Sequence, residues 1–186
     1  MRKVVASLFV SLDGVMEKPE TWHFPYFNDE MGDVIGRAMA STDAFLLGRR
    51  TYEEFAEYWP AQPADDPMAG VMNGMPKFVA STTLDAVTWQ NSTLLGNDVA
   101  GEVAKLKQQP GKDISITGSA TLVRSLLADG VLDELRLMIH PVVVGSGRRL
   151  FEDGSAQASL ELVESETFST GVLNLTYRPA KKGSGS

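Results

Sequence analysis

The segment 114–122 places small and hydroxyl-bearing residues between an apolar strand and a helix. After Ile116 the chain continues as Thr117, Gly118, Ser119, Ala120, Thr121 and Leu122. The amides of a first helical turn have no partner within the helix, and the helix dipole gives them partial positive charge. Small side chains let a pyrophosphate approach such amides closely. The segment therefore predicts a phosphate site at 117–122, and the alternative is a plain turn in which Ser119 caps the helix.

A second junction of this kind follows the apolar residues 44–47. Gly48 stands at the expected strand end, and the helix that follows begins with Arg49, Arg50 and Thr51. Two guanidinium groups beside free amides suit a phosphate monoester, such as the 2′-phosphate that distinguishes NADPH from NADH. The alternative is that both arginines are solvated surface charges.

A third apolar strand, 77–80, ends in hydroxyl groups at Ser81 and Thr82. The carboxyl ends of parallel strands lie at one edge of an open α/β sheet, which is where such sheets bind nucleotides. Each junction is a weak signal by itself, but three of them together predict a nucleotide site. The chain lacks the G-x-G-x-x-G fingerprint, so a standard Rossmann site is not expected.

Apolar runs and amphipathic repeats predict the elements that would position these junctions. The run 3–10 is nearly continuous, as expected for a central strand covered on both faces. Helices are expected after Asn28, over 52–59, after Asp98 and over 119–129, because apolar residues recur there at helical spacing. Further strands are expected at 44–47, 77–80 and 113–116, and the segments 87–89 and 93–95 are expected to supply one or two short strands. The proline-rich stretch 60–75 is expected to be a surface loop.

The pattern changes after residue 130. Leu135, Leu137 and Ile139 alternate with other residues, and alternation returns near 160 and at 173–177. These segments predict half-exposed strands, with a hairpin turn at 169–171. The fold class is therefore α/β, with a mainly parallel sheet finished by antiparallel strands at its C-terminal end. Residues 1–179 are expected to form one domain and 180–186 a flexible tail or linker.

Composition narrows the classes of function. The chain has 17 basic and 24 acidic residues, and this net charge of −7 disfavours nucleic acid as the main partner. It has no cysteine, which excludes thiolate chemistry, and its two histidines are far apart in sequence, so no metal is expected. No run of about 18 apolar residues is present, so we expect a cytoplasmic protein without a membrane span. Neither a Walker A motif nor a G-x-S-x-G elbow occurs.

An aromatic loop follows the first expected strand. It precedes Asp29 and comprises Trp22, His23, Phe24, Pro25, Tyr26 and Phe27. A group of flat rings suits the wall of a pocket for a planar substrate, and core packing is the alternative. The second histidine, His140, lies before Pro141 on an alternating strand and is expected to be structural.

These pieces, in this order, resemble the dihydrofolate reductase fold, and more closely the reductase domain of bacterial riboflavin biosynthesis. The sequence SLDG at 11–14 is similar to the turn that follows the first strand of that domain. The sequence GRRTYE at 48–53 matches the G-R-x-T-[YW]-E element of dihydrofolate reductases, and 141–151 resembles the segment P-x-x-x-G-x-G-x-x-L-F of the riboflavin reductases. The resemblance covers about residues 3–178 and implies three layers, α/β/α, around a mixed sheet.

The resemblance implies a homodimeric, NADPH-dependent reductase that transfers a hydride to a small heterocyclic or carbonyl substrate. By that match, 48–51 would hold the pyrophosphate and the 2′-phosphate, 81–82 would lie at the adenosine end, and 117–122 would cap the pyrophosphate. The loop 13–16, with Val15 and Met16, would flank the nicotinamide. Asp13 is the first candidate for assisting proton transfer, with Asp29 or His23 second. The substrate would contact Trp22, His23, Phe27 and Asp29.

Departures from the family patterns bear on the substrate. Folate reductases place an acidic residue where the ungapped match puts Phe27, and riboflavin pyrimidine reductases carry E-G-G where this chain has TGS at 117–119. The zinc-binding deaminase half is missing, so deamination is not expected. The leading function is a reductase resembling 5-amino-6-(5-phosphoribosylamino)uracil reductases. The alternatives are a non-catalytic module that binds NADPH or a pteridine, and an enzyme of the dihydrofolate reductase type.

Overall fold

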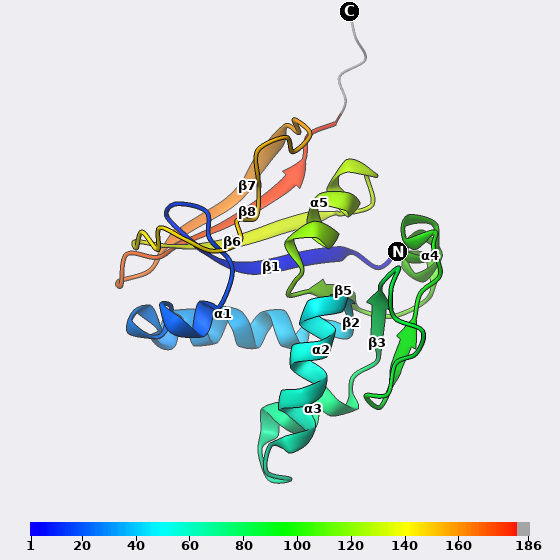
Figure 1. Cartoon of the computed structure of the whole chain (residues 1–186). Helices are drawn as coiled ribbons and strands as arrows, with labels where there is room; N and C mark the ends of the chain where they lie inside the picture. Colours follow the sequence, from blue (N-terminus) through cyan, green and yellow to red (C-terminus); the bar gives the residue numbers. More distant parts are fainter. Residues whose placement is uncertain (182–186) are drawn as a thin grey trace, which may run out of the picture.

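The computed structural model describes residues 1–181 and contains an eight-stranded sheet in the order β4-β3-β2-β5-β1-β6-β8-β7 (Figure 1). Strands β1 to β6 are parallel to their neighbours among themselves, whereas β8 runs antiparallel to β6 and to β7. This arrangement confirms the predicted mixed, mostly parallel sheet. The strands are β1 (Val4–Ser11), β2 (Thr42–Gly48), β3 (Lys77–Ala80), β4 (Ser92–Leu94), β5 (Asp113–Ile116), β6 (Glu134–His140), β7 (Leu160–Thr167) and β8 (Leu173–Pro179).

Helices cover both faces of the sheet, which gives the three predicted layers. Apolar residues of α4 and α5 pack on one face, and those of α1, α2 and α3 pack on the other. Side chains cap three of the helices as the sequence predicts: Asn28 accepts from the Met31 amide, Asp98 from the Gly101 amide and Ser119 from the Leu122 amide. The helices are α1 (Asp29–Ala40), α2 (Arg49–Tyr58), α3 (Pro67–Gly74), α4 (Val99–Gln108) and α5 (Ala120–Ala128).

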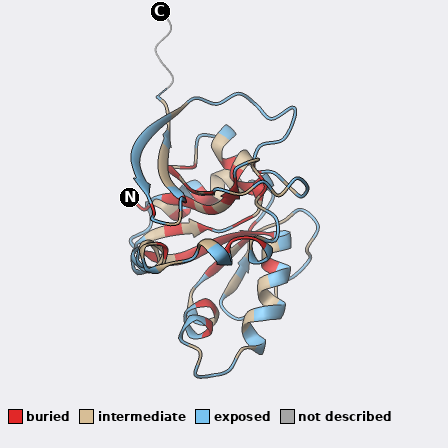
Figure 2. Cartoon of the chain, turned by 90° about the vertical axis from the view of Figure 1, so that its left-hand side faces the viewer, coloured by how far each residue is buried: buried red, intermediate tan, exposed pale blue. Residues whose placement is uncertain are grey.

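The core follows from the apolar strands at the centre of the sheet. In β1, Val4, Ala6, Leu8 and Val10 point to the face covered by α5, where they are at most 5 % exposed. Figure 2 shows the buried residues concentrated along the central strands and on the helix surfaces that face them. The outer strand β7 is exposed along most of its length.

The prediction of a surface loop at 60–75 is wrong, and the structure decides how many strands lie between 87 and 95. The stretch 60–75 contains α3, because Asp66 caps the amides of Met68 and Ala69, and Pro67 occupies the first helical position, where its missing amide costs nothing. Of the two segments 87–89 and 93–95, the second supplies a strand, β4. The first does not, since the amides of Thr88 and Trp89 donate to the Tyr52 hydroxyl instead of to a neighbouring strand.

Lys77 at the start of β3 is fully buried. Its ammonium donates to the carbonyl oxygens of Met72 and Met75, both at 2.7 Å, and lies 4.1 Å from the centre of the Trp89 ring. Burial lowers the pKa of Lys77 to about 8. The side chain thus satisfies carbonyl groups at the C-terminal end of α3, where the helix dipole favours a cation.

A second buried charge, Glu134, begins β6 and is 3 % exposed. Its carboxylate accepts hydrogen bonds from Lys3 at 2.8 Å, Arg136 at 2.6 Å and Arg178 at 3.1 Å. Burial by itself would raise the pKa of Glu134, but these three donors hold it at about 2. The cluster joins the segment before β1 to β6 and β8.

None of the helices within residues 1–181 is long and apolar enough to cross a membrane. The expected tail at 180–186 lies mostly outside the described residues, since 182–186 are not part of them.

Candidate functional site

The three predicted junctions meet at one edge of the sheet. Strands β3, β2 and β5 are adjacent and parallel, so their carboxyl ends lie side by side. The Gly48 amide donates to the Gly118 carbonyl oxygen at 3.3 Å, which joins the second junction to the first. The peptide bond between Gly118 and Ser119 is cis.

Two glycines permit this close approach. A Cβ atom on Gly48 would lie 3.2 Å from the Ser119 amide nitrogen and would overlap the Ser119 hydroxyl. A Cβ atom on Gly118 would overlap the hydroxyl of Thr51. The starts of α2 and α5 therefore pack together only because neither position carries a side chain.

Replacing Gly48 by alanine is expected to lower the free energy of unfolding by about 1–2 kcal/mol, as overpacking does, because the contacting Ser119 amide belongs to the backbone and cannot rotate away. Chemical denaturation measures this change. The matched control is Gly36→Ala in α1, where a Cβ would meet nothing within 4 Å and helix propensity predicts a gain of about 0.5–1 kcal/mol. Equal stability of Gly48→Ala and wild type would contradict the packing argument.

The start of α2 is rich in unused hydrogen-bond donors. Gly48 has no side chain to cap the helix, so the first amides of α2 point to the sheet edge without a side-chain partner. Arg49 and Arg50 are exposed, and Arg49 lies 3.9 Å from Glu53. No acidic residue stands in this first turn. Cations at a helix N-terminus oppose the helix dipole, so the two arginines cost stability unless an anion lies beside them.

The start of α5 supplies a second set of donors. The Ser119 hydroxyl accepts from the Leu122 amide at 3.3 Å, which confirms the predicted cap, while Thr117 and Thr121 are exposed. Ala120 and Leu122 are buried in the core, so only their backbone faces the sheet edge. The cap and a phosphate site are compatible, because the cap takes one amide and leaves those of Ala120 and Thr121.

The third junction is partly occupied by its own turn. The Ser81 hydroxyl accepts from the amides of Thr83 and Leu84 at 3.1 and 3.0 Å, so it closes the turn after β3. Thr82 is exposed beside it. Of the two residues predicted for an adenosine contact, Thr82 has the freer side chain.

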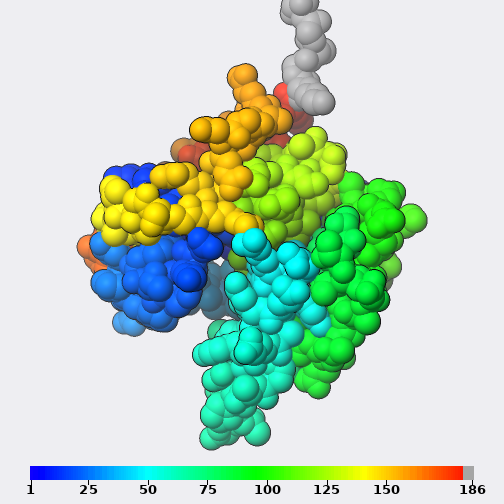
Figure 3. All heavy atoms as spheres, viewed as in Figure 1, coloured from blue at the N-terminus to red at the C-terminus, as the bar shows by residue number. Residues whose placement is uncertain are grey.

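A loop after β1 and a loop after β6 bind each other across the same edge of the sheet. We call the segments 11–17 and 141–150 the clasp. Backbone hydrogen bonds join Leu12 to Val142, Met16 to Arg148 and Leu150 to Gly14, with distances of 2.8–3.0 Å. Figure 3 shows the two segments (blue and yellow) meeting above α2 (cyan), with the surface hollowed between α1 and α2.

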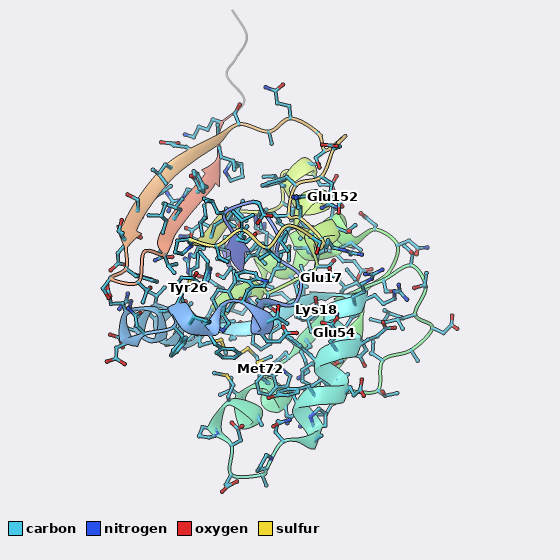
Figure 4. The ribbon with its side chains drawn as sticks, turned by 60° about the vertical axis from the view of Figure 1, so that its left-hand side comes forward. Glu17, Lys18, Tyr26, Glu54, Met72 and Glu152 are labelled. Atoms are coloured by element: carbon cyan, nitrogen blue, oxygen red, sulfur yellow. The ribbon has the colours of Figure 1, made fainter. Side chains whose placement is uncertain are left out.

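Val15 is fully buried in the clasp and bridges to Arg149, and Met16 packs on the core. The Arg148 amide donates to the Glu17 carboxylate at 3.0 Å. Figure 4 shows Glu17 and Lys18 where the clasp comes toward α2. The residues predicted to flank a nicotinamide are therefore held by a firm two-loop support.

Asp13 is the centre of the clasp. Its carboxylate accepts from the Ser11 hydroxyl at 2.6 Å and from the amides of Val144 and Gly145 at 3.1 and 2.8 Å. Arg149 donates to the Asp13 carbonyl oxygen at 2.9 Å. The Ser11 hydrogen bond, followed by the two amides, lowers the pKa of Asp13 to about 2. An ionised carboxylate with both oxygens occupied suits loop anchoring better than proton donation.

Replacing Asp13 by asparagine is expected to loosen the clasp, because an amide NH₂ group must then face one of the two backbone amides. Amide hydrogen exchange of Val144 and Gly145 should become about tenfold faster, as loss of a charge-assisted hydrogen bond implies. Exchange in α4 serves as the internal control and should not change. Unaltered exchange at Gly145 would show that Asp13 does not hold this loop.

Arg124 of α5 was not predicted as part of the site. Its guanidinium donates to the Leu150 carbonyl oxygen at 2.7 Å and lies 3.4 Å from Glu152, so it ties the start of α5 to the clasp. Its position two residues after the predicted phosphate segment is the signal for it in the sequence.

The aromatic loop lies on the face of the sheet covered by α1. Trp22 and His23 are buried, whereas Phe27 is half exposed and Asp29 is exposed in the first turn of α1. His140 was predicted to be structural, yet its ring contacts that of His23, with centroids 5.9 Å apart. The alternation of β6 places His140 and Met138 on one face of the sheet, but it does not show that His23 lies against that face.

Comparisons with known proteins cover most of the chain. A family model described as the RibD C-terminal domain matches residues 2–174. The uncharacterized protein YyaP of Bacillus subtilis is 32% identical over 180 residues, which are 95% of this chain and 94% of YyaP.

Two solved structures show the fold. A putative riboflavin biosynthesis protein from Shewanella sp. PV-4 has a TM-score of 0.75 at 21% identity, over 97% of this chain and 100% of that chain. A dihydrofolate reductase from Enterococcus faecalis, complexed with NADP(H), has a TM-score of 0.63 at 15% identity, over 96% of this chain and 97% of that chain. The fold is therefore that of the dihydrofolate reductases.

Proposed function

Because the chain belongs to the RibD C-terminal domain family, we propose that it is an NADPH-dependent reductase acting on a small heterocyclic or carbonyl substrate. Within that class, the motifs resemble those of 5-amino-6-(5-phosphoribosylamino)uracil reductases. The observation that carries the proposal is the pair of arginines at the uncapped start of α2. The positive end of the helix dipole repels their charges, and a bound phosphate would offset this repulsion by attracting both the arginines and the helix amides.

The residues present fit such a cofactor. Gly48 and Gly118 let the starts of α2 and α5 approach each other, and the first amides of both helices would donate to a pyrophosphate lying across them. Arg49 and Arg50 would bind the 2′-phosphate, and Thr82 would lie at the adenosine end. When bound, NADPH supplies a hydride to the carbon of a C=N or C=O bond, the heteroatom takes up one proton, and NADP⁺ remains.

The chain itself would align the reactants and exclude water. The clasp would cover the reacting end of the site, and Asp13 would act as a positioning residue by holding 144–145. Asp29 and His23 are then the candidates for delivering the proton. Neither role needs a covalent nucleophile.

The test is a titration with NADPH followed by tryptophan fluorescence, and then an assay of reduced-nicotinamide absorbance. We expect saturable binding of NADPH. We then expect NADPH to be oxidised when a substrate is added, and the compounds to try are 5-amino-6-(5-phosphoribosylamino)uracil, dihydrofolate and a simple carbonyl compound. Binding without oxidation would favour the alternative of a non-catalytic module. Absence of binding would overturn both.

We also propose a homodimer, as the family resemblance implies. The support is that β7 and β8 leave large apolar side chains exposed, among them Leu162, Val163 and Leu173 at 51, 45 and 39 %. Burial of these side chains between two copies would remove apolar surface from water. Light scattering after size-exclusion chromatography measures the mass directly.

A further inference from the structure

Helix α5 carries a single charged side chain, Arg124, and this side chain lies beside the first turn of the helix. Arg124 follows Thr121 by three positions, so the two side chains are neighbours on the helix surface. The guanidinium lies 3.5 Å from the Thr121 hydroxyl, and 20 % of the side chain is exposed. Val123 and Leu126 occupy the opposite flank and are fully buried. Arg124 therefore stands at the surface, next to the turn whose amides are proposed to bind a pyrophosphate.

The guanidinium of Arg124 reaches from α5 to the end of the clasp. Its Nη1 donates to the Leu150 carbonyl oxygen at 2.7 Å and to the Arg149 carbonyl oxygen at 3.4 Å. Its Nη2 lies 3.4 Å from the Glu152 carboxylate. Figure 4 shows Glu152 where the chain leaves the clasp and passes α5. Both terminal nitrogens of Arg124 are thus used to hold α5 against this segment.

Leu150 connects Arg124 to the residues predicted to flank the nicotinamide. The Leu150 amide donates to the Gly14 carbonyl oxygen at 3.0 Å. Its neighbour Arg149 forms an isolated bridge with Val15, the residue after Gly14. A continuous path of contacts therefore leads from the first turn of α5, through Arg124 and Leu150, to Val15.

Directional contacts between α5 and the end of the clasp come from Arg124. Among the side-chain hydrogen bonds within residues 1–181, those of Arg124 are the ones that join α5 to the segment 149–152. Beyond this contact, a cleft of about 910 Å³ opens between α5 and residues 155–159. Leu150 also packs in the core, but apolar packing is not directional, whereas a guanidinium holds its acceptors in a planar fork. The spacing between α5 and the clasp therefore depends on Arg124.

We propose that Arg124 is a positioning residue for NADPH, a role that rests on the proposed reductase function. It sets the spacing between the clasp and the free amides of Ala120 and Thr121, so that both supports contact one coenzyme molecule. The two amides would donate to the pyrophosphate, and Val15 would flank the nicotinamide. Without Arg124 the clasp must be ordered when the coenzyme binds, and the cost of that ordering lowers the affinity.

This role differs from a direct contact with phosphate. The donors of Arg124 are engaged with two carbonyl groups and with Glu152, whereas Arg49 and Arg50 are exposed at the start of α2. A residue that positions the clasp affects ligands that reach the clasp. A residue that binds phosphate affects every ligand that carries the phosphate.

The test compares NADPH with 2′-phospho-ADP-ribose, which has the same phosphates and adenosine but no nicotinamide. Calorimetry on the full chain measures the Kd of both for wild type and for Arg124→Met, which keeps an apolar stem and removes the donors. The variant is expected to bind NADPH about tenfold more weakly, as loss of one charge-assisted hydrogen bond implies, and to bind 2′-phospho-ADP-ribose within about twofold of wild type. Equal weakening of both ligands, or wild-type binding of both, would overturn the positioning role.

Amide hydrogen exchange gives a readout without any ligand. The Leu150 and Met16 amides donate to backbone carbonyl groups within the clasp. Both should exchange about tenfold faster in Arg124→Met, because the support from α5 is lost, and the Val103 amide in α4 should keep its rate. An unchanged rate at Leu150 would show that Arg124 does not set the position of the clasp.

Two further variants separate the shape of the guanidinium from its charge. Arg124→Lys keeps the charge but loses the fork, so it should weaken NADPH about threefold and leave 2′-phospho-ADP-ribose unchanged. It carries the same comparison of ligands if Arg124→Met does not fold. Glu152→Gln keeps both carbonyl contacts of Arg124 and is the matched control, which should bind both ligands like wild type. Wild-type binding of NADPH by Arg124→Lys and Arg124→Met alike would overturn the proposal.

Failure of the reductase function gives a different result. In that case the wild-type chain itself does not bind NADPH. Failure of the positioning role leaves wild-type binding intact and removes the difference between the two ligands in Arg124→Met.

Discussion

Replacing Arg49 and Arg50 together by alanine will raise the Kd for NADPH about 100-fold and leave the Kd for NADH nearly unchanged. A charge-assisted hydrogen bond to a phosphate is worth about 1.5–3 kcal/mol, and the partial exposure of Arg49 places each bond at or below the lower end of this range. Two such bonds then amount to about 2.7 kcal/mol, which corresponds to about 100-fold in Kd. The loss falls on NADPH because NADH has no 2′-phosphate. Fluorescence titration with the two cofactors measures both constants.

Thermal unfolding of the same double variant separates this effect from damage to the fold. Alanine favours the helix, and removing two cations from the start of α2 relieves their repulsion by the dipole, so Tm should stay equal or rise. Arg37→Ala in the last turn of α1 is the control and should bind both cofactors normally. Equal weakening of NADPH and NADH would rule out a 2′-phosphate contact.

Replacing Glu134 by glutamine will lower the free energy of unfolding by about 3 kcal/mol. Removing one partner from a buried charge cluster leaves the others uncompensated, and the half-exposed Lys3 and Arg178 place the cost at the lower end of the usual range. Urea denaturation at neutral pH measures the change. Glu166→Gln on the exposed strand β7 is the control and should change the stability by less than about 0.5 kcal/mol.

The pH dependence gives an independent readout of Glu134. Its pKa is about 2 in the folded chain, below the ordinary value of 4.5, so the unfolded chain binds the proton more readily. The stabilisation is therefore present above pH 4.5 and is lost as the pH falls from about 4.5 toward 2. Glu134→Gln should show a weaker loss across this window, and a curve parallel to wild type would contradict the assignment.

The elements with strong local signals could be predicted from the sequence. Strand β3 has the predicted bounds, and α4 begins after its Asp98 cap and ends before Pro110. Helix α3 was missed because its proline and glycines are also typical of loops. It forms because Met72 and Ala69 are buried against the rest of the fold, which is a tertiary effect.

The three junctions could be predicted because parallel strands bring their carboxyl ends to one edge whatever their order. The clasp could not, since Asp13 and Val144 are 131 residues apart and meet only through the pairing of Ser11 with His140 in β1 and β6. The contact of His23 with His140 depends on the same register. Long-range pairing of this kind leaves no local pattern in a single sequence.

Burial of Lys77 makes its amine a chemical reporter of one region of the chain. Acylating reagents need a free, accessible amine, and the Lys77 amine is enclosed by carbonyl groups and by the ring of Trp89 while α3 stays packed on β3. The rate at which Lys77 is labelled can be followed by mass spectrometry. It therefore reports how readily the chain opens locally beneath α3. The exposed Lys112 reacts without such opening and calibrates the reagent within the same molecule.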